Sequence, residues 1–396
     1  MSDPVNEDLT PSKPPVWKNP RVHAWVAQAV LLGAVLAFFL YIFHNTVVNL
    51  EARGISTSFD FLNQEAGFGI IQSLIPYTPA STYGRTFFVG LLNTVMISVL
   101  GIFFATVLGL IIGLARLSQN WLIAKVAAIY IETFRNIPLL LQVFFWYFAV
   151  VQTLPSPRQS MHIGQLVFVN IRGIYLPRPV FGPGSGFVLT ALIVAIIAVI
   201  ILGRWAHLRQ ERTGQQFHTI WVSVATLVLL PLVAFLAVGS PLSWNLPKLQ
   251  GFNFQGGIAV IPELTALLIA LTIYTASSIA EIVRSGILSV SHGQTEAASS
   301  LGLKRSFTMR LVVLPQAMRV IIPPLTSQYL NLTKNSSLAT AIGFPDLVNV
   351  FAGTTLNQTG QAVIIIAMTM AVYLTISLLI STIMNWYNYR KRLIER

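Results

Sequence analysis

Residues 291–315 read SHGQTEAASSLGLKRSFTMRLVVLP, a polar and basic stretch between two apolar segments, and the rest of the chain is organised around it. Ser291 and Gln294 have the spacing of a capping box, in which two side chains satisfy free backbone donors at a helix start. Gly302 predicts the end of this helix, because glycine enters the left-handed conformation without strain. The stretch therefore predicts a short helix followed by a turn.

A second short helix is predicted after that turn. Ser306 can cap it, and Pro315 predicts a bend into the next apolar segment, because proline removes a helix hydrogen bond. Helices this short are marginal alone and gain most of their stability by packing on a larger body. Small side chains at 297–300 permit close approach of a partner, and the charged residues around them are Glu296, Lys304, Arg305 and Arg310. We therefore predict a docking element at a membrane surface.

The composition is that of a membrane protein. Of the 396 residues 54% are apolar and only 10% are charged, and the mean hydropathy is +0.70. A soluble domain of this length needs more surface charge. The net charge of +12 does not require nucleic acid, because the basic residues lie in short segments between the apolar ones. The chain has no cysteine, which excludes disulfides and thiol catalysis, and residues 1–20 lack the pattern of a signal peptide.

Apolar stretches of about 20 residues are long enough to cross a bilayer as helices. The predicted spans are 24–43, 87–114, 126–151, 187–203, 219–238, 258–282, 320–343 and 362–386. The second span contains Gly90, Gly101, Gly109 and Gly113, and small residues let membrane helices approach one another closely. The predicted fold class is an all-α membrane protein with about eight transmembrane helices.

The distribution of lysine and arginine predicts the orientation. With eight spans both ends lie on one side, together with residues 291–315, and most of the basic residues fall on that side. Basic residues favour cytoplasmic loops, so the tails at 1–23 and 389–396 are both predicted to be cytoplasmic.

Two stretches on the opposite, outer side resemble strands. NIRGIYLPRPVF begins at Asn170 and KLQGFNFQGGIAVIP begins at Lys248, and both alternate apolar and polar residues around glycine. Either they pair as a small external cap that helps to receive a soluble partner, or they are irregular loops without a role.

No enzyme constellation is present in the sequence. There is no phosphate-binding loop, the glycines at 182, 184 and 186 have the wrong spacing for a dinucleotide fingerprint, and the six histidines show no metal-ligand spacing. We expect that this chain binds no metal and no cofactor and does not itself hydrolyse ATP.

Ionisable residues inside predicted spans are candidates for function, because burying a charge in a membrane is costly. Lys334 lies in the polar sequence NLTKNSS with Asn331, Asn335 and Ser336, in a span that Pro323, Pro324 and Gly343 loosen. Lys334 and these neighbours either contact a substrate carboxylate or gate its path, or Lys334 simply extends to a surface or pairs internally.

Two further charged pairs have helical spacing. Glu281 and Arg284 are three residues apart, so they share a helix face; they either pair with each other or contribute to the substrate path. Glu132 and Arg135 stand before Pro138 at the same spacing and are predicted to be a structural pair.

The docking element resembles the cytoplasmic coupling loop of binding-protein-dependent ABC importer permeases. The motif residues are Glu296-Ala297-Ala298, Gly302, Val312 and Leu314-Pro315, with valine in place of the usual isoleucine. The segments YIETFRNIPLLLQ, AEIVRSGILSVSHGQTEAASSLGL and LPQAMRVIIPPLTSQYLNLTKNSSLA are similar to the polar amino-acid branch of that family. The additional first span and the hairpin within 152–257 resemble the long general L-amino-acid permeases and their glutamate, glutamine, aspartate and asparagine relatives.

This resemblance implies a type I importer permease in the bacterial inner membrane, with a transmembrane domain at 87–388, an extra helix and periplasmic loop at 24–86, and a coupling loop at 289–317. The implied partners are a second homologous permease, two copies of a cytoplasmic ATPase that uses ATP and magnesium, a periplasmic amino-acid-binding protein and the lipid bilayer. The implied function is ATP-driven import of L-amino acids whose identity the sequence leaves open. The alternatives are a polar loop that matches by chance, a DNA-reading helix-turn-helix, an ion-coupled carrier, a channel or scaffold, and an exporter.

Overall fold

The computed structural model describes residues 20–52 and 58–390, so most of the predicted tails at 1–23 and 389–396 lies outside the described residues. Six helices of the described part are long and apolar enough to cross a membrane. They are α1 (Pro20–Ala52), α2 (Tyr83–Arg116), α5 (Ser185–Thr213), α6 (Thr219–Ala237), α7 (Pro262–Leu288) and α12 (Ala362–Arg390). The predicted class, an all-α membrane protein, is confirmed.

The span predicted at 126–151 is broken into two helical pieces. Helix α3 (Trp121–Asn136) and the helical run Leu139–Thr153 meet at an angle of 104°. Proline restricts the residue before it to an extended conformation, and Ile137, which precedes Pro138, has φ −89° and ψ 128°. The Gln142 side-chain amide donates to the carbonyls of Phe134 and Ile137 at 2.9 and 3.0 Å, which holds the corner. The second piece consists of α4 (Leu139–Phe144), η3 (Phe145–Val150) and η4 (Val151–Thr153).

The span predicted at 320–343 is amphipathic rather than uniformly apolar. It forms α10 (Leu314–Asn335) and η7 (Ser336–Ile342), and α10 packs against α2, α7 and α12. The structure therefore has six apolar spans, or seven if the bent pair is one span, against the eight predicted. The difference arises because α10 carries a polar face. The short helices around these spans are η2 (Phe59–Asn63), η5 (Pro157–Gln159), α8 (His292–Ser300), α9 (Arg305–Thr308), η6 (Met309–Val313), η8 (Val348–Thr355) and α11 (Leu356–Thr359).

Glycines on α2 allow it to lie directly against its neighbours, as predicted. A β-carbon at Gly113 would fall 2.8 Å from the carbonyl oxygen of Ala280 on α7. A β-carbon at Gly90 would fall 2.9 Å from the α-carbon of Leu347. Such distances leave no room for a larger side chain, so the glycines set the spacing of the helices.

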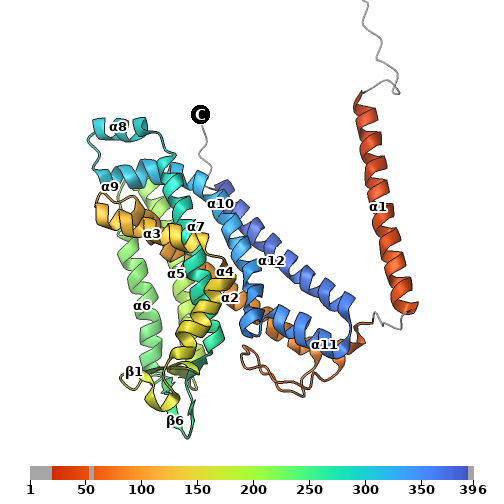
Figure 1. Ribbon diagram of the computed structural model, residues 1–396. Helices are drawn as coiled ribbons and strands as arrows, with labels where there is room; N and C mark the ends of the chain where they lie inside the picture. Colours follow the sequence, from red (N-terminus) through yellow and green to blue (C-terminus); the bar gives the residue numbers. More distant parts are fainter. Residues whose placement is uncertain (1–19, 53–57, 391–396) are drawn as a thin grey trace, which may run out of the picture.

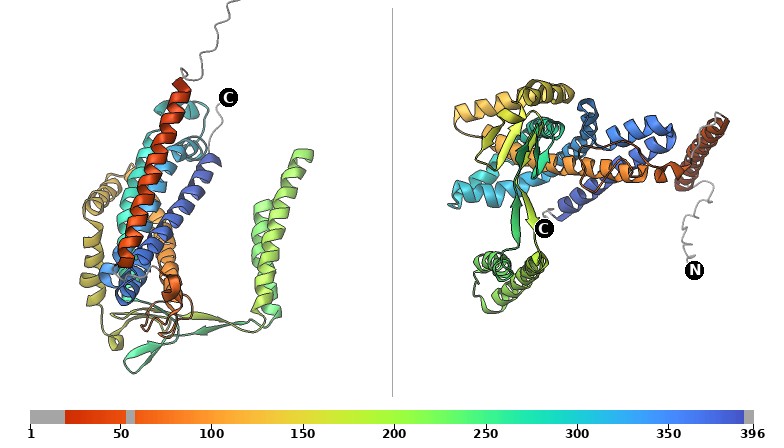
Figure 2. Two further views of the ribbon diagram at one scale, coloured as in Figure 1. Left: turned by 90° about the vertical axis from the view of Figure 1, so that its right-hand side faces the viewer. Right: turned by 90° about the horizontal axis from the view of Figure 1, so that it is seen from below.

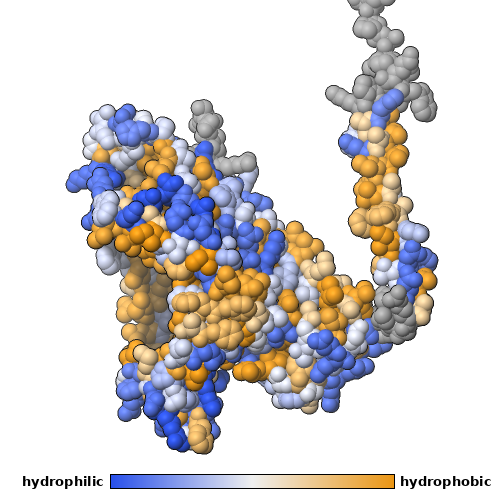
Figure 3. Space-filling view, viewed as in Figure 1, coloured by the Kyte–Doolittle hydropathy of each residue, from blue (hydrophilic) through white to orange (hydrophobic). Residues whose placement is uncertain are grey.

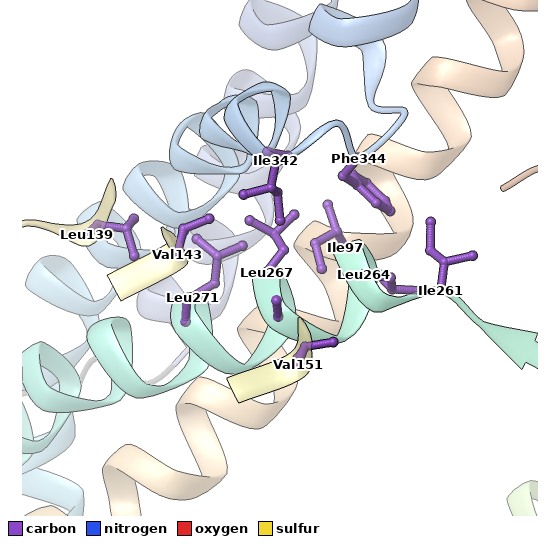
Figure 4. Packing of buried hydrophobic residues seen from close by; sticks show 13 residues of the cluster. Ile97, Leu139, Val143, Val151, Ile261, Leu264, Leu267, Leu271, Ile342 and Phe344 are labelled. Atoms are coloured by element: carbon purple, nitrogen blue, oxygen red, sulfur yellow. The ribbon is translucent and has the colours of Figure 1, made fainter. Parts of the chain in front are cut away.

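The main apolar core lies where α2, α4 and α7 meet the segment after α10. Figure 4 shows the side chains of Ile97, Val143, Leu267 and Phe344 converging there, and each of them is completely excluded from solvent. Contacts of this kind tie the broken third span to the same body as the unbroken spans.

Short strands flank the α5–α6 hairpin in the sequence. They are β1 (Met161–Ile163), β2 (Val167–Asn170), β3 (Gly173–Leu176), β4 (Arg178–Phe181), β5 (Leu242–Asn245), β6 (Lys248–Gln250), β7 (Asn253–Gln255) and β8 (Ile258–Val260). The antiparallel sheet has the order β1-β2-β3-β8, and two further pairs are β4-β5 and β6-β7. Ile174 lies opposite Val260, so the two predicted stretches do pair with each other.

The arrangement separates two ends of the molecule. Helices α8 and α9 lie at one end, and β1 and the β6–β7 hairpin lie at the other (Figure 1). The Pro20 end of α1 and the Arg390 end of α12 both lie at the same end of the molecule as α8 (Figures 1 and 2). The α5–α6 hairpin and α1 stand apart from the central bundle (Figure 2), and Figure 3 shows that α1 is mostly apolar. The ends are therefore hydrophilic and the sides apolar, as a membrane requires.

Candidate functional site

The docking element begins with helix α8, whose start differs from the predicted capping box. The Ser291 side chain makes no capping hydrogen bond, and the backbone N–H of Gln294 instead donates to the Ser291 carbonyl at 3.1 Å. The Gln294 side chain faces another helix, where its Oε1 accepts a hydrogen bond of 3.3 Å from Gln316 of α10. The capping-box prediction is wrong because this glutamine ties α8 to α10.

The end of α8 is the predicted one. Gly302 has φ +74°, its N–H donates to the Ser299 carbonyl at 2.9 Å, and the N–H of Leu303 donates to the Ala298 carbonyl at 3.1 Å. These two bonds form a Schellman motif, which satisfies the last carbonyls of the helix. Glycine is required here by its backbone conformation alone, since no atom lies within 4 Å of an added β-carbon.

The second helix has no serine cap, and it continues directly into η6 and α10. Helix α9 begins at Arg305 with Lys304 at its N-cap position, so Ser306 lies inside the helix. Pro315 does not break the helical run; α9, the π-helical η6 and α10 follow one another directly. Proline has no N–H to donate to the carbonyl four residues earlier, which explains why the ladder widens into a π-helical turn before it.

The side chains of α8 divide into one inward and several outward residues. Ala298 is buried, with 4% of its surface exposed. Glu296 and Ala297 are exposed, together with Ser299 and Ser300, and Glu296 lies 2.9 Å from His292. The free surface of α8 therefore consists of small and polar side chains, as predicted, and only Ala298 is turned inward.

Leu301 is a residue that the sequence reading missed. Its side chain is 81% exposed between the polar end of α8 and Gly302. Its place on the docking element makes it a candidate contact residue for a partner. The sequence signal was available, because Leu301 is the only large aliphatic residue in 291–302.

Helix α10 connects the docking element to the interior of the bundle. It crosses α7 where Gly286 lies directly against Ile321, and a β-carbon at Gly286 would fall 3.5 Å from the Ala317 carbonyl. Gln316, one turn before this crossing, holds α8. The docking helix α8 is therefore joined by a hydrogen bond to the helix that carries the predicted polar site.

The structure divides that predicted polar site between two faces of α10. Asn331 and Lys334 are exposed on one face, and Ser327 continues this face one turn earlier. Ser336 is fully buried and donates to the Thr333 carbonyl at 2.7 Å, while Asn335 is half-buried. Only Asn331 and Lys334 of the predicted group therefore present polar atoms outward together.

Glu281 and Arg284 pair with each other on α7. The Arg284 Nη2 and Nε donate to the two Glu281 oxygens at 2.6 and 2.9 Å, with about 30% of each side chain exposed. Arg116 and Arg135 lie close enough to interact electrostatically with Glu281. Glu132 and Arg135, which were predicted to pair, form no ion pair in the part of the chain that the structure describes. The backbone carbonyl of Glu132 accepts a hydrogen bond of 2.8 Å from the Asn136 side chain.

A buried carboxylate that the sequence reading missed lies after η7. Asp346 is completely buried and accepts a hydrogen bond of 2.8 Å from the N–H of Asn349, at the start of η8. The hydroxyls of Thr340 and Tyr373 each lie 3.4 Å from this carboxyl group. Burial raises the pKa of Asp346 to about 7. A single aspartate after Pro345 gives little signal in the sequence, because its burial depends on α12.

Metal binding has no obvious place in this arrangement. Among residues 20–52 and 58–390, no group of three histidine, aspartate or glutamate side chains has the geometry to hold an ion.

Comparison with known proteins identifies the family of the chain. The family model described as "binding-protein-dependent transport system inner membrane component" matches residues 200–393, which include α8 and α10. The putative amino-acid ABC transporter permease protein YhdX of Escherichia coli K12 is 55% identical over 96% of both chains. The general L-amino acid transport system permease protein AapQ of Rhizobium johnstonii is 51% identical over 96% of this chain and 94% of its own length.

More distant relatives have related names. The glutamate/glutamine/aspartate/asparagine transport system permease protein BztB of Rhodobacter capsulatus is 44% identical over 95% of both chains. A solved amino acid ABC transporter with histidines is 22% identical, covers 78% of this chain and 95% of that chain, and has a TM-score of 0.47. The identity to YhdX, AapQ and BztB along nearly the whole length shows that this chain is a multi-pass membrane protein of the amino-acid ABC transporter permease family.

Proposed function

We propose that this chain is the transmembrane subunit of an ATP-driven, binding-protein-dependent importer of L-amino acids. The observation that carries the proposal is the connection between an outward-facing docking helix, α8, and the polar face of α10 through Gln294 and Gln316. In this proposal Glu296, Ala297, Gly302, Leu314 and Pro315 belong to the coupling loop at 289–317. Ala298 supports that loop from within.

The polar face of α10 is the proposed lining of the substrate path. Lys334, Asn331 and Ser327 are exposed on a helix that packs among membrane spans, and such side chains do not face lipid tails without a large cost. A second permease or a water-filled path must therefore cover them. Lys334 would attract the substrate carboxylate there, because an ammonium group and a carboxylate have opposite charges.

The proposed cycle needs three kinds of partner. Two copies of a cytoplasmic ATPase with ATP and magnesium would seat on α8, a second homologous permease would complete the path, and a periplasmic protein would deliver the amino acid. Closure of the ATPases moves α8, and α10 follows because Gln316 joins it to α8. The Gly286–Ile321 contact then joins α10 to α7. The names of AapQ and BztB support amino acids as the cargo.

The proposal also includes the orientation of the chain in the membrane and the boundaries of its domains. Both ends and α8 would be cytoplasmic in a bacterial inner membrane, with the permease domain at 87–388, an extra helix and loop at 24–86, and a periplasmic insertion with a helix hairpin at 152–257. The common end of α1, α8 and α12 and the excess of basic residues there support it.

A transport assay tests the proposal directly. The chain is purified gently with the proteins that accompany it and reconstituted into vesicles together with the binding protein. Uptake of labelled amino acids should require ATP on the α8 side and survive ionophores that collapse ion gradients. Uptake that needs an ion gradient and no ATP would assign the chain to ion-coupled carriers instead.

Substitutions on α8 locate the ATPase contact. Leu301→Ser and Ala297→Phe should each release the ATPase during purification, because both change the exposed face of the helix. Leu166→Ser is the matched control: Leu166 is 52% exposed in the β1–β2 turn at the other end of the molecule, so the ATPase should remain bound. Full ATPase retention by both α8 variants would contradict the coupling-loop assignment.

A further inference from the structure

The segments on either side of the α5–α6 hairpin form a built surface, here called the outer sheet module (residues 155–182 and 241–261). Phe254 joins the two segments: its ring lies 4.6 Å from that of Phe168 and 4.8 Å from that of Tyr175. The Tyr175 hydroxyl also donates to Asn253 at 3.0 Å, and both Tyr175 and Phe254 are buried. The module is therefore a folded unit with its own small core.

The charge of the outer sheet module is of one sign. Its charged residues are Arg158, Arg172, Arg178 and Lys248, and its sequence contains no aspartate or glutamate. All four side chains are exposed. Segments on the outer side of a membrane are usually poor in lysine and arginine. On the proposed orientation this module departs from that trend and has no internal carboxylate to balance it.

Two of these basic residues, Arg158 and Lys248, line the same cleft in the module. The cleft has a volume of about 400 Å³ and lies between the β1–β2 turn and the β6–β7 hairpin. Its polar lining includes Arg158, His162 and Lys248, and its floor includes Phe168 and Phe254.

The rim of the cleft has the composition of a protein contact. The Arg158 guanidinium lies 4.7 Å from the centre of the Phe252 ring, and Phe252 itself is 72% exposed at the tip of the β6–β7 hairpin. Arginine and aromatic side chains are enriched where proteins bind one another. Lipid headgroups lie at the level of the helix ends, whereas the β6–β7 hairpin extends beyond the helix ends (Figures 1 and 2).

We propose that this cleft binds a carboxylate-rich face of the soluble amino-acid-binding protein. The inference rests on the proposed function, which requires such a protein on the side opposite α8. Arg158 and Lys248 pair with its acidic side chains, and Phe252 packs beside them. The hydrophilic surface at the lower end of Figure 3 is this region of the molecule.

A charge-matched pair of double variants tests the cleft in the assembled transporter in nanodiscs. Arg158→Gln with Lys248→Gln should weaken binding of the purified binding protein about tenfold and reduce the dependence of Kd on salt, because both charges contact the partner. Arg172→Gln with Arg178→Gln removes the same charge from the same module outside the cleft, and should change Kd by less than about threefold. All four residues are exposed, so neither variant disturbs the fold.

The outcomes separate the cleft from the function. Wild-type Kd in the cleft variant, or equal weakening by both double variants, overturns the cleft. A difference between the variants that exists in phosphatidylglycerol nanodiscs and disappears in phosphatidylcholine nanodiscs assigns the cleft to lipid and also overturns it. A wild-type transporter that neither binds the binding protein nor hydrolyses ATP faster in its presence contradicts the proposed function, and the cleft with it.

Crosslinking provides a second measurement. The chain has no native cysteine, so Gln165→Cys in the cleft lining can carry a single photo-crosslinker. It should crosslink to the purified binding protein, whereas Gln119→Cys, between α2 and α3 at the other end of the molecule, should not. Equal crosslinking from both positions overturns the cleft.

Discussion

Gly109 on α2 lies so close to Ile279 on α7 that a β-carbon on the glycine would fall 2.7 Å from the Ile279 β-carbon. The same β-carbon would lie 3.1 Å from the Ala276 carbonyl. The Ala276 backbone and the branched Ile279 side chain both block this position, and neither can move away easily. The two spans therefore share a contact that only glycine permits.

A larger residue at this contact should destabilise the bundle. Gly109→Leu forces α2 and α7 apart, and overpacking of this kind costs about 1–3 kcal/mol. The thermal midpoint of the purified protein should fall. Gly33→Leu is the control, because nothing lies within 4 Å of a β-carbon on that glycine of α1. Equal midpoints for the two variants would show that the α2–α7 contact is not tight.

The turn after α8 should tolerate only residues that adopt a left-handed backbone. Gly302→Pro cannot reach φ +74° and removes the N–H that bonds to Ser299, so ATP hydrolysis should continue while uptake is lost. Gly302→Asn should retain at least about half of the uptake, because asparagine accepts this conformation. The ratio of amino acids imported to ATP hydrolysed is the measurement. Normal coupling in the proline variant would contradict a role for this turn.

Lys334 should affect substrate rather than assembly. A hydrogen bond to a charged group contributes about 1.5–3 kcal/mol, so Lys334→Ala should raise the KM for uptake roughly tenfold. The side chain is exposed on α10, so the amount of assembled complex should not change. Lys125→Ala on α3 removes the same charge from another exposed site and should leave the KM unchanged. An unchanged KM in Lys334→Ala would remove this residue from the path.

Asp346 should make stability depend on pH. Its pKa of about 7 lies above the ordinary value, so the folded chain holds a proton that the unfolded chain releases above about pH 4. This contribution to stability is present at low pH and is lost as the pH rises toward 7. The free energy of unfolding should therefore fall by about 2 kcal/mol between pH 5 and 8.

Asp346→Asn isolates that contribution. Asparagine can still accept the hydrogen bond from Asn349, but it carries no charge at any pH. The variant should lose most of the pH dependence and match or exceed the native stability at pH 8. Thermal midpoints at several pH values measure this, and the same slope in both proteins would show that other groups cause it.

Local patterns in the sequence were sufficient for several features. Gly302 ends α8 because the left-handed conformation is a property of glycine itself. The close approach of α2 was predicted from the glycines at 90, 101, 109 and 113, whereas the sequence left open whether the stretches that form β3 and β8 pair. The conformation of Gly302 and the spacing of the α2 glycines can be read from residues near one another in the chain, whereas β3 and β8 are far apart in the sequence.

Other features depended on distant residues. Gln294 has the position of a capping side chain but bonds to Gln316, which a reading of α8 alone does not include. Pro138 was visible in the sequence, yet the size of the bend depends on the packing of α4 against α7 and on the bonds from Gln142. Hydropathy depends only on the number of apolar residues, so the sequence predicted α3 and the run Leu139–Thr153 as one span.

The sequence by itself determined the membrane class and the absence of acidic residues from the outer sheet module, because composition carries both, and its motifs resembled those of the permease family. Only the tertiary structure decided which side chains face outward. It buries Ala298 and Ser336, exposes Leu301 and Lys334, encloses Asp346 and brings Arg158 and Lys248 to one cleft. Exposure depends on what packs against a residue from elsewhere in the chain, and that neighbour has no fixed distance along the sequence.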